Sequence, residues 1–158
     1  KIHGEIVSSI DLRTGGTVTA AGRDCLKTYF KRLRTSLEKV SRGDFLDVPE
    51  GVRATYQEIF DAYESDLGHY FRHLYRIFKF IDESGIEDKR SYAGIVRAQL
   101  SADELGLLFF NGISEHGEKF RVLIERFALL ENLRPKRIPL WEELHGLYDK
   151  SAFGDADV

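Results

Sequence analysis

The chain has 158 residues, 42% of them hydrophobic and 31% charged, and 23 basic against 26 acidic side chains give a net charge of -3. This length predicts one domain, and 11 phenylalanines with 7 tyrosines supply a large core, which excludes disordered, collagen-like and repeat proteins. A single cysteine, Cys25, excludes a disulfide scaffold and a cysteine-based zinc site, and no apolar run approaches the ~18 residues of a membrane span.

The first predicted element is a small β-hairpin over residues 10–19. This segment is rich in β-branched residues and contains the Gly15-Gly16 pair of a tight turn. A hairpin is only marginally stable alone, so we expect this one to pack against the helices that follow.

Helices are predicted for nearly all of the remaining chain. Apolar residues recur at steps of three and four, with loops marked by Gly43 and Pro49 and by Ser84 and Gly85. The predicted helices cover residues 26–40, 52–63, 67–81, 88–100, 120–130 and a short closing segment, 141–148. Pro49 is expected in the first turn of its helix.

One further helix is expected at the centre of the domain. Ser101 and Glu104 have the spacing of a capping box, in which each side chain bonds the backbone N–H of the other residue. Residues 105–110 behind it are apolar on every face, which is typical of a helix surrounded by others. The sequence thus predicts an all-α fold: a single compact domain of about six helices over residues 1–150, with a flexible tail over 151–158.

Charge is distributed unevenly along this domain. Residues 23–42 carry a local balance of +5, and residues 50–66 a balance of -4. One interpretation is that two neighbouring helices have complementary charged faces. The other is that the first helix presents a face that binds polyanions.

The predicted helix 67–81 has a second group of basic residues opposite its apolar stripe: His69, Arg72, His73, Arg76 and Lys79. His69 and His73 have the i, i+4 spacing of a metal-binding pair. However, the three cations beside them would repel a metal ion, and no carboxylate lies among these positions. We therefore expect no metal and no cofactor, and interpret the face as a candidate nucleic-acid-binding strip.

Polar residues also surround the central apolar run, namely Arg97, Gln99, Glu104 and Asn111. They could form a satisfied hydrogen-bond network that fixes how the helices meet, since an unsatisfied buried polar group costs about 1–3 kcal/mol. Alternatively they line a pocket, to which His116 would add an acid–base group.

Three motifs carry a family resemblance: YFRHLYRIF at 70–78, YAGIVRAQLS at 92–101 and ELGLLFFN at 104–111. With residues 119–133, the opening segment 3–10 and the Gly22-Arg23 dipeptide, they resemble the family of putative phage abortive infection proteins of the AbiC type. The resemblance spans residues 3–133 and brings no established active site. The positions that match the motifs are Tyr70, Phe71, Arg72, Tyr92, Arg97, Gln99, Leu100, Ser101, Glu104, Leu105 and Asn111.

The resemblance implies a bacterial or prophage-borne protein that blocks phage propagation at the expense of the infected cell. The first functional hypothesis is a helical sensing or binding domain for a phage component or nucleic acid. The first alternative is a diverged metal-independent ribonuclease with Arg97, Asn111 and His116 as catalytic candidates, although the arginine–histidine spacing of HEPN ribonuclease toxins is absent. The second is a homo-oligomerisation module. Whether the chain is an enzyme stays open.

The absence of methionine, even at the first position, predicts that the chain is a piece of a longer protein. The lone cysteine fits a reducing compartment, so the expected location is the cytoplasm. The segment itself is expected to make no membrane contact, whereas the whole protein could be anchored through a part that precedes Lys1.

Overall fold

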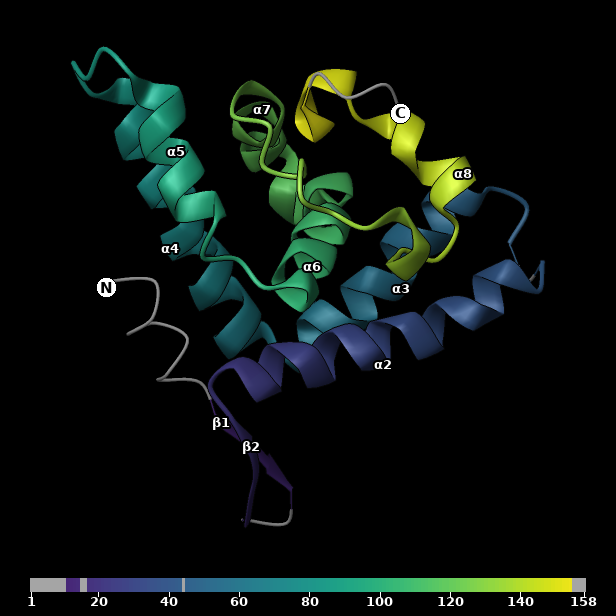
Figure 1. Ribbon diagram of the computed structural model, residues 1–158. Helices are drawn as coiled ribbons and strands as arrows, with labels where there is room; N and C mark the ends of the chain where they lie inside the picture. Colours follow the sequence, from purple (N-terminus) through teal and green to yellow (C-terminus); the bar gives the residue numbers. More distant parts are fainter. Residues whose placement is uncertain (1–10, 15–16, 44, 155–158) are drawn as a thin grey trace.

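The computed structural model describes residues 11–14, 17–43 and 45–154. In this part of the chain seven α-helices and one two-stranded hairpin are present, which confirms the predicted all-α fold (Figure 1). The backbone hairpin joins strand β1 (Asp11–Thr14) to strand β2 (Thr17–Ala21) in antiparallel register, with one irregularity between Leu12 and Arg13. It projects from the start of helix α2 and contacts that helix through β2.

Helices α2 (Arg23–Ser41) and α3 (Val48–Ala62) pack side by side. The stripe from Leu26 to Val40 is buried along α2, and Cys25 is buried at its start. Asp47 caps α3, its carboxylate accepting a hydrogen bond from the Glu50 N–H at 2.8 Å, and Pro49 lies in the first turn as predicted.

The opposite charges of residues 23–42 and 50–66 do not pair directly. Within the described residues, no ion pair joins the two segments. Instead the Tyr29 hydroxyl donates to Asp66 at 2.5 Å, and the Arg32 guanidinium lies over the Tyr63 ring at 5.4 Å. Charge complementarity between the two segments therefore does not take the form of ion pairs among these residues, and aromatic side chains make part of the contact.

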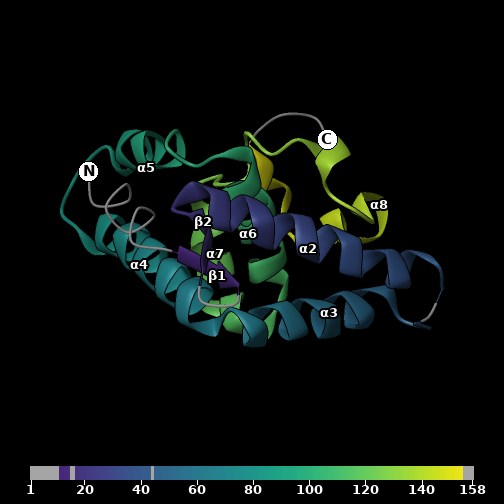
Figure 2. The ribbon, with the colours of Figure 1, turned by 90° about the horizontal axis from the view of Figure 1, so that it is seen from below.

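Helix α4 (Glu64–Glu83) continues from α3 with only Tyr63 between them, and the two run one after the other along one side of the molecule (Figure 2). Helix α5 (Lys89–Arg97) begins where Asp88 accepts from the Ser91 N–H, and it packs against α4. The Asp82 carboxylate at the end of α4 pairs with Arg126 at 2.5 Å, which ties α4 to helix α7 (Glu118–Arg126).

Helix α6 (Ala102–Ile113) lies at the centre, in contact with α2, α3 and α7 (Figures 1 and 2). Every residue from Glu104 to Ile113 is buried, as the apolar run predicted. The predicted capping box is present: the Ser101 hydroxyl accepts from the Glu104 N–H at 3.2 Å, and the Glu104 carboxylate accepts from the Ser101 N–H at 2.7 Å. Both prediction and structure therefore place the beginning of α6 at the same residue.

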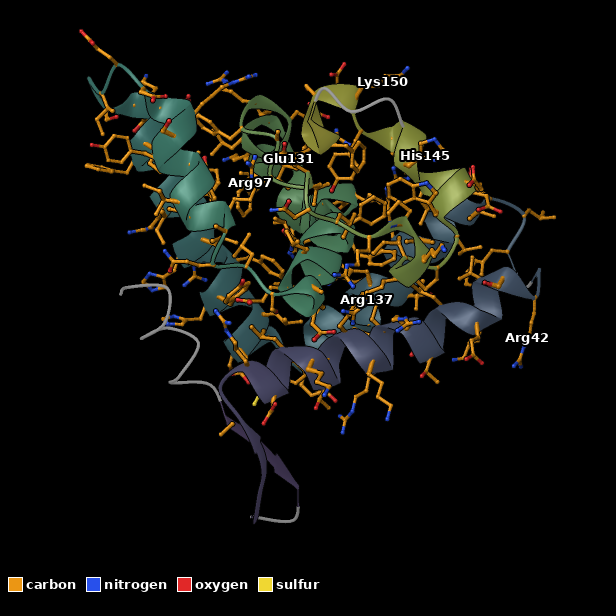
Figure 3. All side chains as sticks on the ribbon, viewed as in Figure 1. Arg42, Arg97, Glu131, Arg137, His145 and Lys150 are labelled. Carbon is orange, nitrogen blue, oxygen red and sulfur yellow. The ribbon has the colours of Figure 1, made fainter. Side chains whose placement is uncertain are left out.

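The chain closes through short elements: η1 (Glu115–Gly117) before α7, then η2 (Pro135–Arg137), α8 (Trp141–Leu144), η3 (His145–Leu147) and η4 (Lys150–Phe153). Arg137 reaches across to the first turn of α6, where it pairs with Asp103 at 2.6 Å (Figure 3).

The flexible tail predicted from residue 151 does not begin there. Ala152 and Phe153 are buried, and the Leu130 N–H donates to the Ala152 carbonyl at 2.9 Å. Phe153 also packs against Trp141 and Tyr148 with ring-centroid distances of 5.3 and 5.9 Å. The prediction failed because one aromatic residue, too isolated in sequence to show a periodicity, anchors the segment. Residues 155–158 lie outside the described residues.

Candidate functional site

The basic residues of α4 form one cationic face, which we define as His69, Arg72, His73 and Arg76. His69, Arg72 and Arg76 are exposed and His73 is half-buried. The rings of His69 and His73 meet edge to face with centroids 4.4 Å apart. Desolvation, then the charges of His69, Arg76 and Arg72, hold the pKa of His73 below its ordinary value. The two arginines therefore give the face a permanent positive charge. Their charges also disfavour protonation of His73.

Lys79, which the sequence placed in the same strip, differs from the arginines. Its ammonium lies 3.6 Å from the Glu83 carboxylate and 5.9 Å from the centre of the Tyr75 ring. In the described part of the chain, by contrast, neither Arg72 nor Arg76 forms an ion pair. Within the cationic face, the positive charge without an ion-pair partner therefore lies on Arg72 and Arg76.

A cavity of about 270 Å³ opens beside this face, where α3, α4, α6, η1 and α7 meet. Its lining is aromatic and cationic and contains no carboxylate: Phe60, Phe71, Tyr75, Phe120, Arg72, Lys119, His116, Gly68 and Asn111. Tyr75 and Phe120 meet edge to face at 5.7 Å. Lys119 is exposed and, like Arg72, has no ion-pair partner among residues 11–14, 17–43 and 45–154. The cavity is therefore suited to an anion that carries a flat apolar part.

His116 is held in one orientation at this cavity. Its ring stacks on Phe60 with centroids 3.8 Å apart, and its Nε2 lies 2.8 Å from Gln57 Oε1. The Gln57 amide donates to Asp61 at 2.6 Å, and because a carboxylate only accepts, the amide oxygen must face the histidine. His116 Nε2 therefore carries a proton, which leaves Nδ1 as the basic nitrogen of the neutral ring.

Asn111 lies at the inner side of the same cavity and is only 1% exposed. Its side-chain amide donates to the Tyr56 hydroxyl at 2.9 Å, and its backbone carbonyl accepts from the Ser114 hydroxyl at 2.6 Å. Burial, the largest effect, raises the pKa of Tyr56, so its hydroxyl stays protonated. Asn111 is thus a fixed group of the cavity that also joins α6 to α3.

Arg97 lies elsewhere, between α5 and the segment that follows α7 (Figure 3). Its guanidinium donates to the carbonyls of Phe127 and Ala128 at 3.3 and 3.0 Å and pairs with Glu131 at 2.5 Å. Ala128 has a positive φ of 50°, and Arg97 thereby holds the turn that ends α7. It lines a separate cavity of about 200 Å³, so the structure does not bring it together with Asn111 and His116.

The other predicted residues are also dispersed. Glu104 is fully buried and accepts from the Tyr70 hydroxyl at 2.8 Å, whereas the side chains of Tyr92 and Gln99 are exposed on and just after α5. The expected single pocket of Arg97, Gln99, Glu104 and Asn111 is not formed, because Glu104 and Arg97 point into different helix contacts.

Sequence reasoning missed Phe60 and Lys119 in the cavity lining, and also Gln57, which contacts His116 from outside the lining. Phe60 was identified only as part of an apolar stripe, and Lys119 only as part of a family segment. No local signal marks them, since Phe60 and Gln57 on α3 are more than 50 residues before His116 and Lys119 in the sequence. Within the described residues, no group of three or more potential metal ligands comes together. None of the described helices combines the length and the apolar character needed to cross a membrane.

Fold and site together define an all-α domain with a cationic, aromatic-walled cavity on its surface. Residues 62–138 match the family model described as putative phage abortive infection protein. This segment, 77 of the 158 residues, is similar to that family, which confirms the resemblance seen in the sequence and supports a role in defence against phage. It contains the cationic face, His116 and Lys119, whereas Phe60 and Gln57 precede it. Neither the curated proteins nor the solved structures include a match to this chain.

Proposed function

We propose that the chain serves anti-phage defence as a helical binding domain for nucleic acid, held on the cationic face of α4 and at the adjoining cavity. The observation that carries this proposal is that Arg72, Arg76 and Lys119 have no ion-pair partner in the described part of the chain. Phosphate groups would supply the missing counter-charges. The family match supports the defence role, and the proposed place of action is the cytoplasm of the infected bacterium.

Reversing the charge of Arg72 and Arg76 to glutamate should weaken binding of a labelled single-stranded RNA at least tenfold. Each single-strand phosphate contact contributes about 0.7 to the slope of log affinity against log salt, so the slope should fall by about 1.4. Fluorescence anisotropy over a salt series measures both quantities. A plaque assay on cells that express the full protein should show protection lost in the same variant.

The matched control reverses Arg42 and Lys150, which are exposed and lie far from α4 (Figure 3). This variant has the same net charge and should keep both binding and protection. Loss of protection in the α4 variant, without any nucleic-acid binding by the unmodified protein, would contradict the proposal.

A second candidate function, metal-independent RNA cleavage, is favoured by the fixed orientation of His116. In this reaction Nδ1 removes the proton of a ribose 2′-hydroxyl, the 2′-oxygen attacks the phosphorus, and the 5′-oxygen leaves with a proton from water. Arg72 and Lys119 would stabilise the charge that develops on the phosphate. The products are a 2′,3′-cyclic phosphate and a free 5′-hydroxyl.

If the chain is such a ribonuclease, His116→Gln should lower the cleavage rate about 100-fold or more, as loss of a general base does. Total RNA from infected and uninfected cells is incubated with the purified protein, and the product ends are identified. His145→Gln is the matched control, since His145 stacks on Trp141 and does not line the cavity. Intact RNA with the unmodified protein in both extracts would rule this candidate out.

A further inference from the structure

The cavity beside the cationic face has the size and the walls for a single ring system. Its volume of about 270 Å³ is slightly below the ~300 Å³ at which pockets for larger small molecules begin. Four aromatic rings line it: Phe60 on α3, Phe71 and Tyr75 on α4, and Phe120 on α7. A planar, partly apolar group therefore fits better than a flexible or purely ionic one.

The cations at the cavity lie where they would meet the charged part of the same ligand. Arg72 belongs to both the lining and the cationic face, and Lys119 stands on α7 across from α4. Arg76 extends the positive charge along α4, beyond the cavity. A ligand that fits this arrangement places a ring inside the cavity and more than one negatively charged group outside it, on these cations.

We propose that the cavity holds one unstacked base of a single-stranded nucleic acid, while the flanking phosphates lie on Arg72, Lys119 and Arg76. This inference rests on the proposed function and specifies it. Bases in single strands are free to leave the stack and to pack on aromatic side chains, whereas those in a duplex are not. The protein therefore selects single strands over duplexes of equal charge.

Gly68 offers a way to fill the cavity without altering any charge. It lies in the lining, and a Cβ placed there would be 3.6 Å from the Phe60 ring, an ordinary contact distance. A leucine at this position would extend from that Cβ into the space of the base. Gly85→Leu makes the same change where nothing lies within 4 Å and is the matched control.

Affinities of the full chain are measured for a labelled oligoadenylate strand, its duplex with oligouridylate, and inorganic polyphosphate. The strand should bind about tenfold more tightly than the duplex, since stacking of one base contributes that much. Gly68→Leu should remove this advantage and leave polyphosphate binding as it was, while Gly85→Leu should change neither. Circular dichroism and thermal unfolding establish that both variants fold.

Equal affinity for strand and duplex, or a strand affinity that Gly68→Leu leaves unchanged, would overturn the inference. Salt-dependent binding that is lost in the Arg72 and Arg76 variant would then still support the proposed function. AMP that binds as tightly as the strand would show a nucleotide site and overturn the assignment to a strand. Failure of the unmodified protein to bind any of the three polyanions would overturn both proposals.

Discussion

Replacement of Glu104 by glutamine is expected to lower the free energy of unfolding by about 3 kcal/mol. The carboxylate is 0% exposed and accepts hydrogen bonds from the Tyr70 hydroxyl and the Ser101 N–H, with the Arg23 guanidinium 3.8 Å away. Glutamine has nearly the same shape but presents an NH₂ group where one of these donors points. One buried donor then loses its acceptor, and Arg23 loses the negative charge beside it. Urea unfolding followed by circular dichroism measures the change.

The control for Glu104 is Glu58→Gln in α3, an exposed position at which removal of the charge should change stability by less than about 0.5 kcal/mol. A Glu104→Gln protein as stable as this control would show that the buried carboxylate does not hold α6 against α4.

Gly106→Ala should destabilise the protein by about 2 kcal/mol, although alanine is the better helix former. A Cβ at Gly106 would lie 2.3 Å from Cζ of Phe30, which is itself buried, so α2 and α6 would have to separate. Overpacking of this kind costs about 1–3 kcal/mol and exceeds the gain of up to about 1 kcal/mol in helix propensity. Thermal and urea unfolding show whether Gly106→Ala lowers or raises the stability of the protein.

Gly94→Ala in α5 is the matched substitution with the opposite expected sign. Its nearest neighbour is a terminal nitrogen of the Arg97 guanidinium at 4.0 Å, so only the helix propensity changes and stability should rise by up to about 1 kcal/mol. A shift in the same direction at both glycines would contradict the close approach of α2 and α6.

The fold was largely predictable because its signals are local. The capping box at Ser101 and Glu104 marks the start of α6, and the apolar run behind it identifies the central helix. The end of the chain was not predictable, since the burial of Phe153 depends on Trp141 and Tyr148, which no periodicity links to it.

The candidate site could be predicted only in part, for a related reason. Arg72, Asn111 and His116 were identified from residue type and neighbourhood, but their common cavity depends on how α3, α4, α6, η1 and α7 meet. Arg97 had the same polar character in sequence, and yet it binds the backbone carbonyls after α7. Residue type shows that a polar group needs a partner, whereas only tertiary packing determines which partner it finds.

The junction at Tyr63 has a consequence for how the cavity responds to a ligand. Tyr63 is both the C-cap residue of α3 and the N-cap residue of α4. Its ring stacks on the Tyr29 ring with centroids 4.2 Å apart. Helix α3, which orients His116, and helix α4, which carries Arg72, are therefore joined directly, without a flexible linker between them. The contact between Tyr63 and Tyr29 fixes this junction to α2. The two walls are held in place before a ligand arrives, so little ordering entropy is lost on binding.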